Sequence, residues 1–409
     1  MTSPRLIGFF ALCFATCFLL ASAASSKTSI MYSGLAFRGN AGEVEDRYPS
    51  SLALANQPAP AGGRISLFRK LLLEAAKATS PPNYTIQFEG TQDLKKGQGL
   101  TLALAIDRES VSIEKLPNEY KILVDINAQL IFFNYEKKSR SVVATFPIVA
   151  SGVTTSEETP SQEKISELVK RVIIGPPLIG GTTIIREFKE ALASYPVKPQ
   201  YKLRVGVTDV AIGPAAESFL PAWARKDQDP MKLALAQMFS RYLSRNQKVS
   251  VVPYGVKDEE TKERQKDGAV GGTMTVQFAN GDIDDFKLPS PDFGVKLDLT
   301  SFKKVLYGET AAEESWIYGA YVTVEGVMQS REKVYLDVPF KQGLTRQIPT
   351  TQTSVDDWPT YYEVLNALMD GLTTELNKKP SKKWLKSHTK DKKAKKQMQA
   401  FAEKLEKCK

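Results

Sequence analysis

The stretch 120-YKILVDINAQLIFFNYEKKSRSVVATFPIVASG-152 decides the fold of this 409-residue chain. Two apolar segments, 120–135 and 141–152, flank the charged residues 136–140. This is the pattern of a long antiparallel hairpin, because its strands are apolar and its polar turn faces solvent. The sequence therefore predicts a hairpin whose tip lies at Glu136–Arg140.

A helix is predicted directly behind this hairpin. Thr159 and Gln162 stand at the spacing of a capping box, and Pro160 suits the first helical position. Apolar residues then recur at i, i+3, i+4, i+7 and i+8 and share one helical face: Ile165, Leu168, Val169, Val172 and Ile173. The unit is a hairpin with one helix packed on it.

The same order returns later in the chain. Two apolar runs, Trp316–Val327 and Lys333–Phe340, flank a polar tip at Gln329–Glu332. Ser354 and Asp357 stand at capping-box spacing before a second apolar stripe, made of Tyr361, Val364, Leu365, Leu368 and Met369. This self-similarity predicts an internal duplication.

Further strands and helices precede both units. In the first half we expect a long surface loop with a short helix near 50–55, then a helix and two short strands. The loop, the helix and the strands are at 38–63, 64–78, 100–106 and 111–113. In the second half we expect a strand, a helix, a strand and a hairpin turn, at 202–212, 229–244, 249–254 and Asn280-Gly281. The helix carries an apolar stripe made of Leu235, Met238, Phe239, Tyr242 and Leu243.

These elements together predict an α+β fold of two tandem modules that arose by internal duplication. Each module is expected to be a mixed sheet with helices packed mainly on one face. The predicted divisions are a signal peptide, a first module, a linker, a second module and a lysine-rich tail, at 1–23, 27–195, 196–201, 202–377 and 378–409.

The first residues have the features of a secretory signal. Arg5 precedes the apolar run 6–20, and Ala21-Ser22-Ala23 suits signal peptidase. An uncleaved anchor is the alternative interpretation. Cys408 is the only cysteine after this segment, so the mature chain has no intramolecular disulfide and suits a bacterial periplasm. We therefore expect a periplasmic or secreted protein.

Positive charge is concentrated in the tail. Thirteen lysines and three carboxylates after Asn377 give it a net charge of +10, against +9 for the whole chain. Met398, Phe401 and Leu405 could share a helical face, as in helices that lie on anionic lipid. The residues predicted to contact a membrane or an acidic polymer are Lys382, Lys383, Trp384, Lys386, Lys392, Lys393, Lys395 and Lys396. A solvated, partly disordered extension is the alternative, and nucleic acid is not an expected partner.

No catalytic, cofactor-binding or metal-binding residue is predicted. His388 is the only histidine and lies in the tail, which excludes a His-based triad or zinc site in the body. Four adjacent carboxylate pairs lie in predicted loops or turns among lysines, which favours solvated surface charge: Glu157-Glu158, Asp258-Glu259, Asp284-Asp285 and Glu313-Glu314. The glycines from Gly268 to Gly272 lack the lysine of a phosphate loop.

The order of strand, helix and strand over Leu203–Ile212, Asp229–Ser244 and Val249–Tyr254 resembles a family of envelope modules. This family includes the amino-terminal domain of the translocation protein TolB and the periplasmic domain of the curli secretion protein CsgG. The hairpin Tyr318–Phe340 and the helix Tyr361–Leu376 match the second half of that pattern. The resemblance implies a periplasmic module that contacts other envelope proteins.

The expected function is that of an exported, non-catalytic envelope scaffold, adaptor or assembly factor acting through protein contacts. Two alternatives remain open. One is a small-ligand or cell-wall-binding protein, which an apolar cleft near Gly175–Pro199 would support. The other is a carboxylate-dependent hydrolase, which requires a deep pocket holding an acid with a raised pKa.

Overall fold

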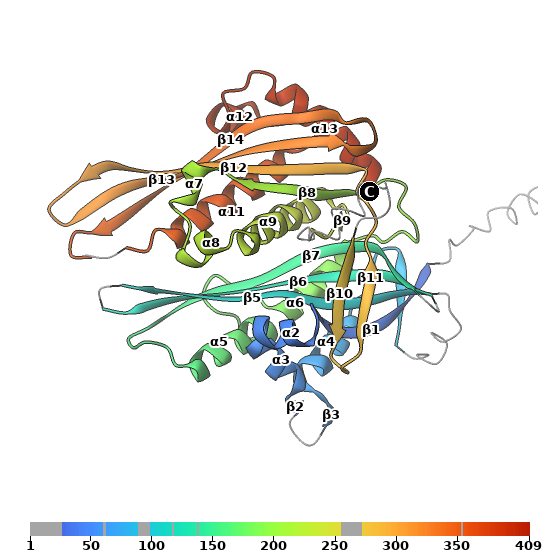
Figure 1. Cartoon of the computed structure of the whole chain (residues 1–409). Helices are drawn as coiled ribbons and strands as arrows, with labels where there is room; N and C mark the ends of the chain where they lie inside the picture. Colours follow the sequence, from blue (N-terminus) through green and yellow to red (C-terminus); the bar gives the residue numbers. More distant parts are fainter. Residues whose placement is uncertain are drawn as a thin grey trace, which may run out of the picture.

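The computed structural model describes residues 27–59, 63–88, 99–116, 118–136, 139–254, 272–352 and 355–409. The predicted signal peptide lies outside these residues. Two sheets are stacked, with two long helices between them and further helices on the outer face of the first sheet (Figure 1). The predicted α+β class with mixed sheets is confirmed.

The first sheet is built around the predicted hairpin. Its strand order is β4-β1-β5-β6-β7, with a further hairpin beyond β7. β1 is parallel to both neighbours, and β5, β6 and β7 form an antiparallel meander. The five strands are β1 (Thr28–Arg38), β4 (Tyr84–Gln87), β5 (Leu100–Lys115), β6 (Tyr120–Glu136) and β7 (Ser139–Ser156). The two short strands predicted within 100–113 are thus one strand, irregular at Ile106/Arg108.

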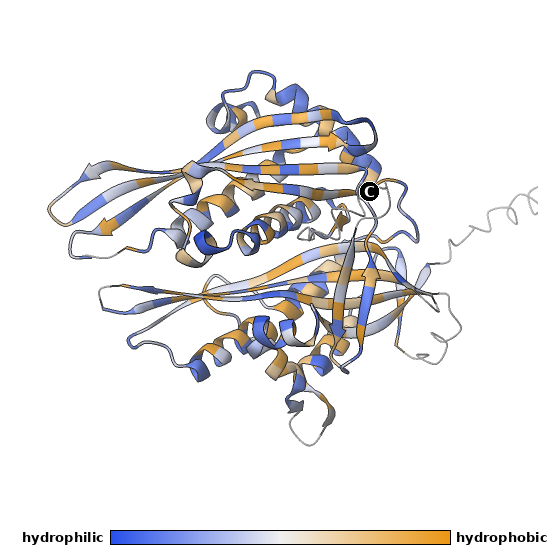
Figure 2. Cartoon of the chain, in the orientation of Figure 1, coloured by the Kyte–Doolittle hydropathy of each residue, from blue (hydrophilic) through white to orange (hydrophobic). Residues whose placement is uncertain are grey.

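The second sheet has the order β9-β8-β12-β13-β14. Its directions repeat those of the first sheet, since β8 is parallel to both neighbours and a three-strand meander follows. The strands are β8 (Val205–Ile212), β9 (Val251–Val252), β12 (Phe293–Glu309), β13 (Glu313–Met328) and β14 (Lys333–Pro349). Figure 2 shows hydrophobic and hydrophilic residues alternating along these strands. The two sheets share this order of strands. That they arose by internal duplication stays a prediction.

Five helices cover one face of the first sheet and share its core: α2 (Ala41–Arg47), α3 (Pro49–Asn56), α4 (Leu67–Lys77), α5 (Gln162–Ile174) and α6 (Ile184–Ser194). The predicted long loop 38–63 is wrong over α2, because Asn40 and Glu43 form a capping box that starts this helix. The short helix predicted near 50–55 is α3. The predicted cap of α5 is also wrong, since Ser161 accepts from the Lys164 amide. The apolar stripe of α5 is buried from Leu168 to Ile173.

The second sheet is covered by α9 (Asp229–Gln247) and α11 (Trp358–Glu375), which lie between the two sheets (Figure 1). Short helices α7 (Pro214–Glu217) and α8 (Ala222–Lys226) precede α9. The stripe predicted for α11 is buried throughout. Asp357, predicted as the capping-box partner of Ser354, instead stands at the N-cap of α11 and makes no capping bond. Its carboxylate accepts from Lys304 Nζ at 2.8 Å and from the Tyr318 hydroxyl at 2.6 Å. Ser354 lies outside the described residues.

The turn at Asn280-Gly281 joins β10 (Thr273–Phe278) and β11 (Ile283–Lys287), as predicted. This hairpin nevertheless belongs to the first sheet, because β10 pairs with β1 and β11 pairs with β7. The strands β1, β5, β6, β7, β11 and β10 therefore form a closed ring. The ring encloses a second apolar cluster that includes Ala103, Phe133 and Phe286. The predicted second module, 202–377, thus contributes a segment to the first.

The tail is part of the second core. It forms α12 (Lys382–His388), α13 (Ala394–Leu405) and a short 3₁₀ helix (Glu406–Cys408), and α12 and α13 both contact β14. Met398, Phe401 and Leu405 do share a face, but this face is buried in the core. The predictions of a disordered extension and of an apolar face free for lipid are therefore wrong. A remaining short pair, β2 (Pro58–Ala59) and β3 (Gly63–Ser66), lies beside α4.

Candidate binding site between the two modules

A cavity of about 620 Å³ lies between the modules. The first module contributes β5, β6, β7 and α6 to its walls, and the second contributes α9 and α11. Residues within the predicted cleft region Gly175–Pro199 form one wall, among them Glu187 on α6 and Tyr195 directly after this helix. The lining is a mixture of charged, polar and aromatic side chains, so the cavity is less apolar than expected.

Helix α9 is buried on two sides because it lies between the sheets. One face carries the predicted apolar residues, such as Leu235, Phe239 and Leu243, toward the second sheet. Another face carries a polar series at i, i+3, i+4 and i+7: Gln237, Ser240, Arg241 and Ser244. All four have buried polar side-chain atoms without a hydrogen-bond partner among the described residues. Buried polar groups are usually satisfied, so this face has hydrogen-bonding capacity that the described residues do not fill.

A hydrogen-bond network fixes the position of Arg241. Its Nη2 donates to Asn366 Oδ1 at 2.7 Å, and the Asn366 amide donates to the Tyr362 carbonyl at 2.8 Å. The Tyr362 hydroxyl donates to Asp125 Oδ2 at 3.2 Å, which links α11 to the first sheet. The guanidinium also lies 4.4 Å from the ring centre of Tyr242. Arg241, 9% exposed, is thus held in place while its Nε has no partner among the described atoms.

The cationic wall of the cavity is formed by α9 and the residue after it. Arg241, Arg245 and Lys248 stand at i, i+4 and i+7 and all line the cavity. Lys248 has a left-handed backbone, with φ of 54°, and its amide closes the helix by donating to the Ser244 carbonyl. Its Nζ lies 5.1 Å from the ring centre of Tyr195. Burial and the nearby Arg245 charge lower the pKa of Lys248.

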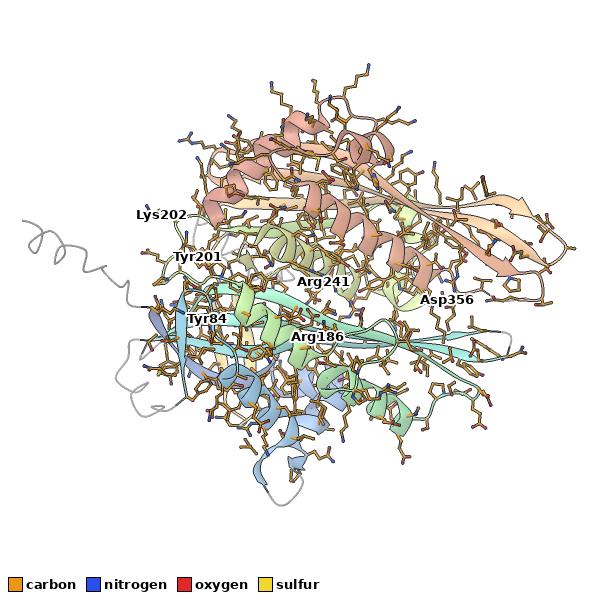
Figure 3. All side chains as sticks on the ribbon, turned by 180° about the vertical axis from the view of Figure 1, so that it is seen from behind. Tyr84, Arg186, Tyr201, Lys202, Arg241 and Asp356 are labelled. Atoms are coloured by element: carbon orange, nitrogen blue, oxygen red, sulfur yellow. The ribbon has the colours of Figure 1, made fainter. Side chains whose placement is uncertain are left out.

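Carboxylates line other parts of the cavity. Glu187 on α6 is half-buried, and burial raises its pKa. Glu190 is paired with Arg186 at 2.9 Å on the exposed side of α6 (Figure 3). Glu114, 3% exposed, lies 3.8 Å from Lys121 and 3.5 Å from Arg346, the latter on β14. Glu114–Arg346 is therefore an ion pair between the modules.

A second hollow, of about 20 Å³, holds the acid Asp107. Burial raises the pKa of Asp107 to about 6, although Gln129 Nε2 donates to its Oδ1 at 2.8 Å and the Arg38 charge opposes the shift. This hollow holds no more than about one water molecule, so Asp107 cannot act on a substrate there. Glu187, in contrast, is an acid with a raised pKa in a large cavity, so the hydrolase alternative keeps a candidate residue.

The predicted tail contacts are not brought together with this cavity. Trp384 is half-buried, packs on Phe340 and stacks on His388 with ring centres 4.2 Å apart. Lys395 is half-buried, and the other predicted lysines are exposed on α12, on α13 or between them: Lys382, Lys383, Lys386, Lys392, Lys393 and Lys396. These lysines form a basic surface on the folded helices of the tail.

The described residues also bear on the predicted carboxylate pairs. Glu157 and Glu158 are exposed, Glu314 accepts from the Trp316 indole at 2.8 Å, and Asp284 pairs with Arg140. The pair Asp258-Glu259 lies outside the described residues. No group of three or more potential metal ligands occurs in the part of the chain that the structure describes. No described helix is long and apolar enough to cross a membrane.

Sequence reasoning missed the residues that line the cavity. Arg241 and Asp125 lie inside apolar segments, 235–243 and 122–133, that were interpreted as core. A charge inside such a segment is itself a signal, because charged residues are rarely buried without a partner. Tyr242 belongs to the predicted apolar stripe of α9, but in the structure it lines the cavity.

Comparison with known proteins adds little. No protein-family model matches the chain, and no curated protein matches it. Among solved structures, it is similar to a Helicobacter pylori protein described as a neuraminyllactose-binding hemagglutinin homologue. The alignment covers 47% of this chain and 92% of the other, with 15% identity and a TM-score of 0.23. A similarity at this TM-score supports no argument about this chain, and the resemblance to TolB and CsgG modules stays a prediction.

Proposed function

We propose that the protein is an exported, non-catalytic binding protein that holds a small polar ligand in the cavity between its modules. One observation carries this proposal: Arg241 is nine-tenths buried in a cavity lined by both modules, and its Nε has no partner among the described residues. Burying a guanidinium without an acceptor for its Nε lowers the stability of the folded protein. A ligand acceptor at this nitrogen would restore the lost hydrogen bond. The volume also lies within the usual range of ligand pockets, roughly 300 to 1,000 Å³.

Native mass spectrometry of the protein, purified gently from its own cells, tests the proposal. We expect a bound small molecule whose mass is lost on denaturation. Ser194→Trp fills the cavity at an exposed lining position and should abolish this mass. Ala193→Trp is the matched control, because Ala193 is the exposed neighbour and does not line the cavity. A protein that never retains a molecule, or loses it equally in both variants, contradicts the proposal.

A second candidate is the scaffold or adaptor role, acting through protein contacts. The far ends of β12, β13 and β14 extend beyond the helices that cover the sheet (Figure 1). This extension exposes apolar side chains, with Leu306 44% and Tyr307 75% exposed. Exposed apolar residues grouped in this way favour a contact surface. Cross-linking in the native envelope should recover a partner protein with the wild type. The double variant Leu306→Ser, Tyr307→Ser should no longer recover it. Recovery of the same partner with wild type and variant would show that this surface is not the contact.

A further inference from the structure

We infer that the cavity binds a zwitterionic ligand of the amino-acid or short-peptide class, with the anionic group at Arg241 and the cationic group at the acidic residues around it. This inference rests on the proposed binding function and specifies its ligand. It follows from the charges that line the cavity, from their pairing and from the neutral groups between them.

The anionic group is assigned from the cations of α9. None of Arg241, Arg245 and Lys248 has a carboxylate oxygen of a described residue within 4.0 Å. Arg241 is buried, whereas Arg245 and Lys248 are exposed and therefore lie nearer the mouth. In Figure 3, Arg241 lies on α9 between the two modules. Among the described residues, Arg241 donates to the neutral Asn366 amide oxygen and to no carboxylate, so its charge is available for a carboxylate or phosphate.

The cationic group is assigned from carboxylates on three other elements. Asp125 on β6, Glu187 on α6 and Glu363 on α11 line the cavity, and none has a cationic partner within 4.0 Å among the described residues. Asp125 is 7% exposed, and among the described residues its carboxylate accepts from the neutral Tyr362 hydroxyl. Three such carboxylates and three such cations therefore line the same cavity. A ligand with a single negative charge would complement one side and be repelled by the other.

Neutral hydrogen-bonding groups separate the charged ones. Short side chains from both sheet and helices present hydroxyls and one amide to the cavity: Ser112, Ser151, Thr182, Ser194 and Asn366. Three tyrosine rings add flat apolar surface: Tyr195, Tyr242 and Tyr362. Groups of this kind suit a molecule with peptide-like amides between its charged ends, since each amide has both a donor and an acceptor to satisfy.

Calorimetric titration of the full mature protein with three peptides tests the inference. Tri-alanine carries both charges, N-acetyl-tri-alanine keeps only the negative charge, and tri-alanine amide keeps only the positive charge. At equal ionic strength we expect tri-alanine to bind, and each capped peptide to bind at least about tenfold more weakly, since each loses a charge-assisted hydrogen bond.

Three variants connect the ligand charges to the residues. Arg241→Gln should remove the preference for tri-alanine over its amide, and Glu187→Gln should reduce the preference over the N-acetyl form. Arg245→Gln changes an exposed residue and keeps the test valid if Arg241→Gln fails to fold. Arg225→Gln is the control, because Arg225 is exposed on α8 and does not line the cavity; it should leave all three affinities unchanged.

The outcomes separate this inference from the binding function itself. Equal affinity for tri-alanine and its N-acetyl form overturns the cationic subsite, and binding of none of the three peptides overturns the ligand class. If a molecule of another charge type is still found by native mass spectrometry, the binding function stands without this inference. If no molecule is retained and no peptide binds, both fall.

Discussion

Asp107 shows how burial of a single carboxylate lowers the stability of the folded protein when its hydration is lost. It is 8% exposed, next to Gln129 and near Arg38, in a hollow too small for substrate. Its partners do not offset the loss of hydration, since burial still raises its pKa from 3.8 to about 6. The folded protein therefore keeps this acid protonated up to about pH 6.

The Asp107→Asn variant tests this cost. Between pH 4 and 6 the folded protein keeps a proton that the unfolded chain has released, so wild-type stability falls as pH rises. Relative to wild type, the free energy of unfolding of Asp107→Asn should therefore rise by about 2.4 kcal/mol between pH 4 and 7. Urea denaturation at each pH measures the difference. A difference that does not change with pH would show that Asp107 is not the group responsible.

Backbone strain at Glu332 supports a second prediction. Glu332 ends the turn between β13 and β14 with φ of 49°, a conformation that glycine adopts at no steric cost. Glu332→Gly should raise the free energy of unfolding by about 0.5 to 1 kcal/mol, the steric relief less the added entropy of the unfolded chain. Arg331→Gly, one residue earlier and without positive φ, is the control and should destabilise. Equal effects of the two variants would contradict this account.

At the scale of single elements, the tail helix α13 behaves as core despite its lysines. Phe401 is fully buried, and a Cβ on Gly326 of β13 would lie 2.7 Å from its ring. Phe401→Ala should lower the free energy of unfolding by about 3 to 5 kcal/mol. Lys396→Ala, on the exposed side of the same helix, should change it by less than about 0.5 kcal/mol. Similar small effects in chemical denaturation would mean that the tail does not contribute to the core.

The elements themselves could be predicted well from local patterns. The apolar stripes of α5, α9 and α11 and the Asn280-Gly281 turn depend on neighbouring residues, and the structure has them close to the predicted positions. What could not be predicted is which partner each element packs against. The apolar stripe of the tail could pack against lipid or against protein. The polar face of α9 is buried only because the first sheet covers it.

At the scale of the whole molecule, the hairpin β10–β11 makes the modules interdependent. Phe286 of β11 packs edge-to-face on Phe133 of β6, with ring centres 4.7 Å apart. The chain between this hairpin and the first module includes all of β8, α9 and β9. This exchange could not be predicted, because strand pairing between segments far apart in the sequence leaves no local pattern.

A fragment comprising 27–201 should therefore be unstable on its own. It lacks β10 and β11, so the apolar cluster around Phe133 would be exposed to water. The same fragment with residues 272–291 joined by a flexible linker restores the closed ring and is the matched control. Thermal unfolding followed by circular dichroism should show a cooperative transition only for the joined fragment. A cooperative transition for 27–201 alone would show that the first sheet does not need the hairpin.

This exchange of a hairpin has a consequence for biosynthesis. The first sheet cannot be completed until the chain beyond Lys287 has been made, and ribosomes add about 5 to 20 residues per second. For many seconds a nascent chain therefore exposes an apolar sheet surface that the hairpin has not yet covered. Cells that make this protein should have to shield the unfinished first half with a chaperone until the closing segment arrives.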